Sequence, residues 1–349
     1  MKKVLYIAEN VESAQFRYRV KNVAEALQDS SDWSAKWVLK SDLANTDLLN
    51  VDLVVILRQT EKDGILLDFI KKVHLAGLKV LFDLDDLVFD YKDLLILMKG
   101  TNSKNIAYWA GYIWGIRRIA KKADGFITTN EFLAGKLKRS FNKPCGVIPN
   151  SLNSEQIKVA DESLEDKKHG GFAIGYFSGS PTHTKDLKLV EPEIFRFLDE
   201  HKDAKLRIVG YMELSSEMQR RVKNGQVEIC DLVDYLEQIK MMSKVDVNIA
   251  PLVISEFTNC KSELKFFEAA VVETITIASP TYAFKKAISD GKNGFLAQPG
   301  EWYDKLGYLY NNPSENRKIA KAARKYALEN HYGKKFVKEV EEAYRFFCN

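Results

Sequence analysis

The sequence predicts an α/β protein made of two domains, each with a mostly parallel sheet. Short apolar runs rich in β-branched residues alternate with helical patterns over most of the chain, and one polar, charged stretch interrupts this alternation near the middle. The alternation is typical of βαβ units. The 349 residues also exceed what a single hydrophobic core usually holds. We therefore expect two doubly wound domains in tandem.

Six strands are predicted in the first half, because each run is short, apolar and bounded by turn residues. These strands are expected at residues 3–8, 35–39, 53–57, 79–84, 125–129 and 145–149. Apolar residues at helical spacing predict helices between them. The clearest of these helices are expected at residues 13–28, 62–77, 106–124 and 130–141.

A linker is predicted at residues 156–171, because residues 153–171 are polar and highly charged, lack a strand pattern and end in Gly-Gly. The first domain would then span residues 1–155 and the second residues 172–332. Strands of the second domain are expected at residues 172–179, 204–211, 227–230, 246–252, 274–279 and 294–299. Three helical stretches follow, at residues 301–312, 313–330 and 333–347.

Composition excludes several classes of protein. The net charge of +4 is too small to indicate a nucleic-acid-binding protein. The four cysteines are scattered without metal-ligand spacing and are expected to be reduced thiols in a cytoplasmic protein. The N-terminal residues lead directly into a strand without a signal-peptide pattern. The longest uncharged apolar run, residues 106–116, is too short to span a bilayer, so a soluble or peripheral protein is expected.

The first candidate site follows the first strand of the second half, in the sequence GYFSGSPTHTKDL at residues 175–187. A Gly/Ser turn that leads into a helix favours phosphate binding, although the P-loop ending is missing. An ordinary βα turn is the alternative. The candidate residues are Gly179, Ser180, Thr182, His183 and Lys185.

The second candidate site is the sequence CKSELKFFEAAV at residues 260–271. If this stretch is a helix, Lys261, Lys265 and Glu268 fall at i, i+4 and i+7 and share one face. Two lysines one turn apart favour an anion beside them, and Asn259 or Ser262 would cap the helix. A glutamate further along can accept hydrogen bonds from sugar hydroxyls. A solvated charged face is the alternative.

These two stretches and the terminal helices resemble the GT-B-fold glycosyltransferases, in particular the retaining enzymes of glycosyltransferase family four that build bacterial surface polysaccharides. The resemblance implies two Rossmann-like domains facing a central cleft, with a nucleotide-sugar donor bound by the second domain and no required metal. It implies that Glu268 holds the ribose, that Lys185, Lys261 and Lys265 neutralise the diphosphate, and that a final helix at residues 333–349 crosses back to the first domain. The family's first glutamate, which contacts the transferred sugar, falls at Cys260, so this sequence departs from the family there.

The first domain would bind the acceptor. Arg17 and Arg19 follow the first strand, and because they are two residues apart on a helix, one is expected to face the cleft and the other solvent. Asp85 and Asp86 lie in the sequence DLDDLVFD at residues 83–90 and could orient an acceptor hydroxyl, one of them as general base. His183 is a third catalytic candidate. The Asp-Leu-Asp triplet also resembles a metal-binding motif, but that motif is common by chance.

The helix expected at residues 106–124 is aromatic along much of its length and then basic. It is either a core helix whose cations suit its C-terminal end, or a peripheral membrane surface. Its cations are Arg117, Arg118, Lys121 and Lys122.

We therefore expect a nucleotide-sugar-dependent glycosyltransferase that acts on a glycan or lipid-linked glycan, in the cytoplasm or at the inner face of the membrane. Two alternatives remain open. A nucleotide-sugar epimerase of the same fold would react with the donor alone. A degenerate, non-enzymatic subunit would bind a glycan or a protein partner, and the cysteine at position 260 favours this alternative.

Overall fold

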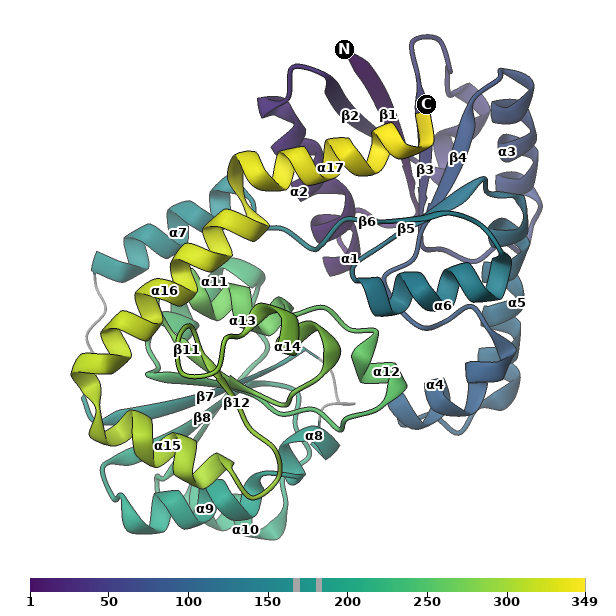
Figure 1. Ribbon diagram of the computed structural model, residues 1–349. Helices are drawn as coiled ribbons and strands as arrows, with labels where there is room; N and C mark the ends of the chain where they lie inside the picture. The colour runs from purple at the N-terminus through teal and green to yellow at the C-terminus, as the bar shows by residue number, and fades with distance from the viewer. Residues whose placement is uncertain (166–169, 180–183, 349) are drawn as a thin grey trace. The chain divides into compact units, whose positions relative to one another are not determined.

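The computed structural model describes residues 1–165, 170–179 and 184–348. The chain forms two compact units (Figure 1). Unit 1 consists of Met1–Asn153, Asn259–Ser262 and Glu329–Asn349, and unit 2 consists of Ser154–Thr258 and Glu263–Leu328. Four residues from the middle of the second half therefore belong to unit 1.

Unit 1 contains a six-stranded parallel sheet in the order β2-β1-β3-β4-β5-β6. Its strands are β1 (Lys2–Ala8), β2 (Trp33–Leu39), β3 (Leu53–Leu57), β4 (Lys79–Asp83), β5 (Gly125–Thr128) and β6 (Cys145–Val147). The order reverses between β1 and β3. In doubly wound sheets, ligands bind outside the carboxyl ends of the strands at such a reversal.

The helices of unit 1 differ from the expected ones mainly near the N-terminus. The single helix predicted at residues 13–28 is divided into α1 (Ala14–Phe16), a π-helical turn η1 (Arg17–Lys21), α2 (Asn22–Ala26) and a 3₁₀ turn η2 (Leu27–Asp29). The π turn changes the register at which side chains meet the sheet. The others are η3 (Lys40–Asn45), α3 (Ile65–Leu75), η4 (Tyr91–Asp93), α4 (Leu94–Gly100), α5 (Ile106–Lys122) and α6 (Glu131–Phe141).

The last helix, α17 (Gly333–Cys348), packs into the core of unit 1. Phe336, Val340, Tyr344 and Phe347 join the cluster that contains buried residues of β1 and β3. The Tyr344 hydroxyl also forms a hydrogen bond with the Tyr6 hydroxyl of β1. The two chain termini consequently lie at the same end of unit 1 (Figure 1).

Unit 2 contains the second six-stranded parallel sheet, in the order β12-β11-β10-β7-β8-β9. Its strands are β7 (Phe172–Ser178), β8 (Ala204–Gly210), β9 (Val227–Cys230), β10 (Val247–Ala250), β11 (Ile275–Ala278) and β12 (Phe295–Leu296). The order reverses between β7 and β10, so the carboxyl ends of these two strands mark the expected ligand crevice. The strands predicted from the sequence in both halves are therefore confirmed.

The remaining helices lie between residues 154 and 331. They are α7 (Ser154–Glu165), α8 (Thr184–Lys188), α9 (Glu191–Glu200), α10 (Ser216–Lys223), α11 (Tyr235–Ser243), α12 (Glu256–Asn259), α13 (Leu264–Ala270), α14 (Tyr282–Ala287), α15 (Trp302–Asn311) and α16 (Pro313–His331).

The linker prediction for residues 156–171 was wrong for its first ten residues, which belong to helix α7. This helix packs on α11, and the Tyr235 hydroxyl donates to Glu155 at 2.6 Å. The residues that α7 buries are Gln156, Ala160 and Ser163. These side chains are small or polar, so the buried face of the helix has no apolar stripe that the sequence could reveal.

Candidate functional site

The candidate donor site in unit 2 begins at the carboxyl end of β7. Gly179 follows this strand directly and is exposed. Lys185 lies in α8, the next helix. Ser180, Thr182 and His183, the other candidates from this turn, lie outside the described residues.

Lys265 brings a cation to the same strand end from helix α13. Its Nζ donates to the carbonyl of Phe177 at 2.6 Å and lies 4.7 Å from the centre of the Tyr176 ring. Burial lowers the pKa of the ammonium from its usual 10.5 to about 8, although Asp186 and Glu268 oppose this shift. A partly buried cation beside the reversal point of the sheet is suited to receive an anionic ligand.

Glu268 follows Lys265 by three residues on the same helix, where side chains at this spacing are neighbours. It is only 2% exposed, and one carboxylate oxygen accepts from Nε2 of Gln238 in α11 at 3.3 Å. Buried carboxylates are rarely tolerated unless they are bonded or functional. Lys265 and Glu268 therefore lie close together on one helix, and Glu268 acts electrostatically on Lys265.

Asn248 on β10 fixes the helix that carries both charges. Its Nδ2 donates to the carbonyl of Lys265 at 2.9 Å and to the Thr276 hydroxyl of β11 at 3.0 Å. The rest of α13 packs into the core through its buried residues Phe266, Phe267, Ala269 and Ala270. Lys265 and Glu268 are therefore carried on a helix held by both packing and hydrogen bonds.

The predicted trio of charges on one helix face was wrong in one member. Helix α13 begins at Leu264, so Lys261 precedes it. Its N-cap residue is Glu263, which makes no side-chain capping bond, while Asn259 ends α12 instead of capping α13. The segment Asn259–Ser262 packs in unit 1, where Ser262 Oγ accepts from Nδ2 of Asn150 at 3.0 Å. This long-range packing keeps the segment out of the helix.

Lys261 forms an ion pair with Asp86 of unit 1. The contact neutralises the lysine that the sequence assigned to the donor diphosphate. It also acts on the aspartate: burial raises the pKa of Asp86, but Lys261 and Arg58 outweigh this effect and hold it below its usual value. Asp86 is consequently a weaker base than an ordinary aspartate.

Cys260, at the position of the missing glutamate, is fully buried in unit 1. Burial raises the pKa of its thiol to about 12, so the thiol stays protonated. The backbone carbonyls of Cys260 and Lys261 each accept from Nδ2 of Asn130 at 3.2 Å. The side chain of Cys260 therefore offers no group that could replace a carboxylate.

Arg58 is the centre of a second polar cluster, in unit 1. Its Nε donates to Oδ1 of Asp85 at 2.7 Å, and one Nη lies 3.9 Å from Asp86. Although burial opposes it, the two aspartates raise the pKa of the guanidinium above its usual value. Asp85 also accepts from Nε2 of Gln15 at 2.8 Å. Asp85, Arg58 and Asp86 remain partly exposed, so the cluster can contact a ligand.

Arg19 does not belong to this accessible cluster, contrary to the expectation that it binds an acceptor. Only 1% of its side chain is exposed, and it forms a buried ion pair with Asp83 at 3.0 Å. It also donates to the carbonyl of Ile148 at 2.5 Å. Burial raises the pKa of Asp83 to about 6, with Arg19 opposing. Within the π turn, Tyr18, Arg19 and Val20 are all buried.

Arg17 is partly exposed, and its guanidinium lies 4.8 Å from the centre of the Tyr18 ring. It remains the acceptor candidate from this stretch. Arg58 and Gln15 were missed by the sequence reasoning. Arg58 follows β3 at the carboxyl edge of the sheet, which is the signal that could have revealed it.

The aromatic and basic helix α5 has a buried face and an exposed face. Ile113, Ile116 and Ile119 are buried, whereas Ile106, Tyr108 and Trp114 are exposed. The cation of Arg118 lies 4.8 Å from the centre of the Trp114 ring. Arg117 donates to the carbonyl of Phe89 at 3.0 Å, while Lys121 and Lys122 are exposed.

Within residues 1–165, 170–179 and 184–348, no group of three or more His, Cys, Asp or Glu residues is placed to hold a metal ion. Over the same ranges, no helix has both the length and the apolar character needed to cross a bilayer.

Comparison with known proteins gives matches at the level of family model and fold. Residues 173–312 match the family model described as glycosyl transferases group 1. No curated protein sequence matches the chain.

Solved structures match over nearly the whole length of both chains. Sucrose-phosphate synthase from Thermosynechococcus elongatus matches with a TM-score of 0.69 and 14% identity, covering 99% of each chain. A glycosyltransferase from Rickettsia africae matches with a TM-score of 0.67 and 15% identity, covering 100% of this chain and 99% of the other. The Anabaena protein HepE in complex with UDP matches with a TM-score of 0.63 and 11% identity, covering 99% of each.

At these identities the structural matches establish the fold. The two parallel six-stranded sheets with flanking helices give this chain the two-domain α/β architecture of the GT-B glycosyltransferases, and its second half carries the group 1 match.

Proposed function

We propose that the protein transfers a sugar, with retention, from a nucleotide-diphosphate sugar to a glycan or lipid-linked glycan in bacterial surface-polysaccharide synthesis. The observation that supports this most is the pair Lys265 and Glu268 beside the reversal point of the second sheet, within the residues that match the group 1 model.

Each member of the pair suits one part of such a donor. The partly buried ammonium of Lys265 would neutralise the diphosphate, and Glu268 would accept hydrogen bonds from ribose hydroxyls. Cleavage of the sugar–phosphate bond leaves additional negative charge on the nucleoside diphosphate. A fixed cation stabilises that charge more in the transition state than in the ground state, which lowers the barrier.

A uridine nucleotide is the first donor to test, because HepE, a protein of the same fold, was solved in complex with UDP. We assign no role to a metal in this step. The lysine supplies the charge compensation that a metal supplies in other transferases.

The acceptor would be held by the cluster around Arg58 in unit 1. Asp85 and Arg58 present an acceptor oxygen and donor nitrogens at the edge of the sheet, which suits sugar hydroxyls. The lowered pKa of Asp86 makes it a poor proton acceptor, so we assign it to positioning Arg58 and Lys261 instead of to general base catalysis.

One observation favours a second candidate function. The buried, protonated Cys260 leaves the transferred sugar without the carboxylate that the resemblance implies. A subunit that binds a nucleotide or a glycan without transferring sugar would tolerate this loss. The second candidate is therefore a non-enzymatic, glycosyltransferase-like binding protein.

Donor turnover distinguishes these candidates. Release of nucleoside diphosphate would be followed with UDP-, GDP-, ADP- and dTDP-sugars, with and without a membrane glycan extract, for the protein and its Glu268→Ala variant. Acceptor-dependent release that is lost in the variant supports the transferase. A changed sugar without acceptor supports an epimerase, and nucleotide binding without turnover supports the binding protein.

A further inference from the structure

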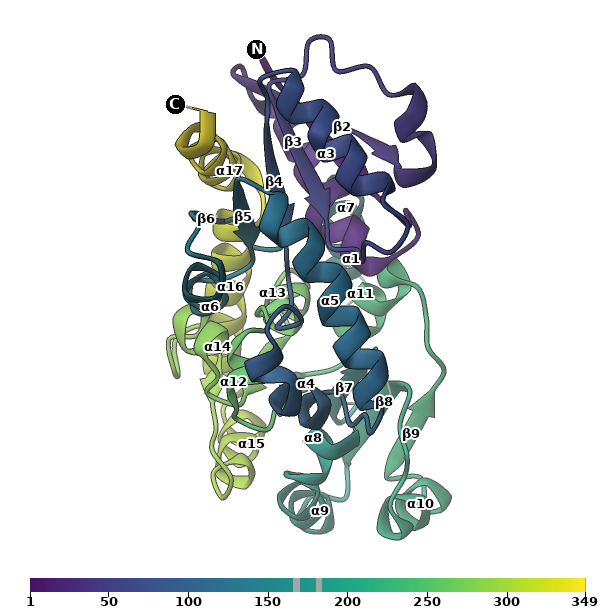
Figure 2. The same cartoon turned by 90° about the vertical axis from the view of Figure 1, so that its right-hand side faces the viewer.

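An exposed apolar surface lies on helices α4 and α5 of unit 1. We define the α4–α5 surface by Leu95, Ile106 and Trp114 together with Lys121 and Lys122. The three apolar side chains are between 50% and 73% exposed. Figure 2 shows α5 on the near side of unit 1, and the helices α3 and α4 pack beside it. Ile106 and Trp114 are eight residues apart and therefore fall on the same side of α5. Exposed large apolar side chains that share a face favour an interaction surface.

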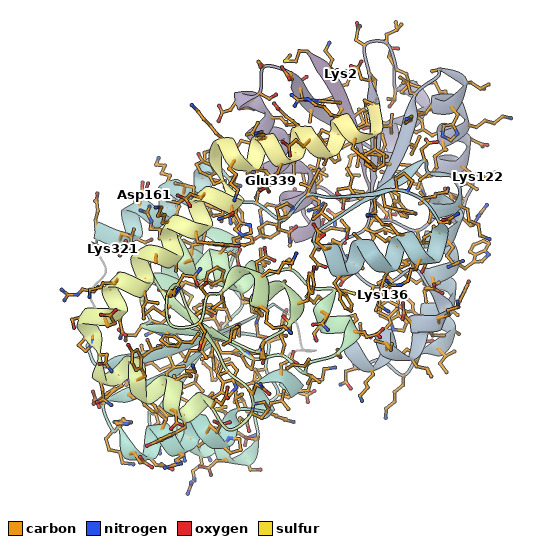
Figure 3. The ribbon with its side chains drawn as sticks, in the orientation of Figure 1. Lys2, Lys122, Lys136, Asp161, Lys321 and Glu339 are labelled. Atoms are coloured by element: carbon orange, nitrogen blue, oxygen red, sulfur yellow. The ribbon has the colours of Figure 1, made fainter. Side chains whose placement is uncertain are left out.

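The charge of this region has a single sign. Residues 94–123 contain no aspartate or glutamate. They contain six cations, namely Lys99, Lys104, Arg117, Arg118, Lys121 and Lys122. Lys122, labelled in Figure 3, lies at the C-terminal end of α5, and it is exposed together with Lys99, Lys104 and Lys121. Arg117 and Arg118 each lie 3.9 Å from an acidic residue of the same unit, Asp90 and Glu61, so the exposed lysines are the cations that complement a negatively charged partner.

The inner face of α5 is tightly packed against unit 1, and this packing holds the outer face in place. Ile113, Ile116 and Ile119 are fully buried. Gly115 packs so closely that an added Cβ would lie 2.8 Å from Cβ of Thr60. On the same helix Trp114 is exposed, and tryptophan favours the boundary between acyl chains and headgroups.

We infer that the α4–α5 surface binds the surface of an anionic lipid bilayer. The apolar side chains would enter the headgroup boundary while the lysines contact anionic headgroups, as in amphipathic helices that lie in the membrane plane. A soluble acidic protein would be matched by the cations but would leave the exposed apolar side chains unexplained. This inference concerns a contact that the transfer reaction itself does not require.

A consequence for the acceptor rests on the proposed function. Tyr112, one turn before Gly115 and Ile116, accepts a hydrogen bond from Arg58 at 3.3 Å. The acceptor cluster is thus in contact with the helix whose outer face would lie on the bilayer. Since a helix with its side chains is about 10–12 Å across, the reacting sugar would lie close to the headgroups. A short lipid-linked glycan is the acceptor class that fits.

Vesicle co-sedimentation tests the inference without any nucleotide or acceptor. The full chain would be mixed with vesicles of phosphatidylcholine alone or of phosphatidylcholine with phosphatidylglycerol. We expect binding only to the second kind, weakened by added salt. Because each cation near an anionic surface strengthens binding about fivefold, Lys121→Ala combined with Lys122→Ala should weaken partitioning about thirtyfold.

Matched controls exist elsewhere on the chain. Lys318→Ala with Lys321→Ala removes two exposed lysines from α16, where Figure 3 labels Lys321, and should leave partitioning unchanged. Trp114→Ala should weaken binding, whereas Trp37→Ala should not, although Trp37 is 44% exposed in the same unit. Thermal melts of all variants verify that these surface substitutions leave the fold intact.

Binding that is equal for both vesicle types, or unchanged in the α5 variants, would overturn the inference. So would a dimer that Trp114→Ala dissociates in the absence of vesicle binding, since a second copy of the chain would then cover the surface. Loss of vesicle binding with intact donor turnover would leave the proposed transferase function standing, so the two claims fail separately.

Discussion

Replacing Lys265 by methionine should raise the stability of the unliganded protein and weaken nucleotide binding. Methionine keeps the apolar stem and removes the charge. The pKa of Lys265 is lowered from 10.5 to about 8 by burial. At about 1.4 kcal/mol per pKa unit, charging this side chain at neutral pH costs up to about 3 kcal/mol. The variant also loses the hydrogen bond from Lys265 to the Phe177 carbonyl, which lowers its stability by about 1 kcal/mol. The partial exposure of Lys265 makes the stabilisation by Lys265→Met smaller still. We expect a net stabilisation of about 1–2 kcal/mol.

The pH dependence gives this prediction a definite sign. Because the folded-state pKa is below the unfolded value, the unfolded chain binds more protons between pH 8 and pH 10.5. Wild-type stability should therefore rise with pH across this window, by at most about 1.4 kcal/mol per unit, and the variant should lack this increment. Diphosphate binding requires the charged amine, so wild-type affinity should fall above pH 8.

Urea unfolding and calorimetric titration with UDP measure the two effects. A charge-assisted hydrogen bond contributes about 1.5–3 kcal/mol, so the variant should bind UDP at least about tenfold more weakly. A variant that is destabilised and binds UDP with unchanged affinity would refute the reasoning, because Lys265 would then be a structural residue.

Three further predictions follow from the corrected positions of the charges. Arg19→Met should lower the free energy of unfolding by about 3–5 kcal/mol, since it leaves Asp83 buried without its partner. An unchanged midpoint of urea unfolding would contradict this prediction and make Arg19 a candidate acceptor-binding residue again. Lys261→Met should change the affinity for UDP by no more than about twofold relative to the wild type, because Lys261 pairs with Asp86. If the variant loses as much UDP affinity as Lys265→Met in the same titration, Lys261 belongs to the donor site. Arg58→Met should leave UDP affinity unchanged and lower acceptor-dependent transfer on the order of a hundredfold, as judged from nucleoside diphosphate release, because about 3 kcal/mol of charged hydrogen bonding to the acceptor would be lost. Equal transfer by the variant would remove this cluster from the acceptor site.

The strands were predictable because their signal is local. Runs such as residues 53–57 and 275–278 are apolar and β-branched, and burial on both faces requires little else from the sequence. The pairing of Lys265 with Glu268 was equally predictable, because three residues on a helix always bring side chains together.

The sequence predictions failed where contacts with distant segments determine the local structure. Lys261 follows the helical spacing of Lys265, but Asn130, Asn150 and Asp86 hold its segment in unit 1, and no local pattern encodes that competition. Arg19 lies buried in the π turn, where Asp83, 64 residues away in the sequence, compensates its charge. Helix α7 was read as a linker because its buried face is polar.

The most direct test of the central claim is calorimetric titration of the protein with UDP, GDP, ADP and dTDP, repeated with Glu268→Ala. The account predicts that one nucleotide binds with micromolar affinity and that the variant loses most of this affinity, because the ribose no longer has its carboxylate partner. A folded protein that binds none of the four, or a variant that binds as tightly as the wild type, would contradict the assignment of a donor site to Lys265 and Glu268.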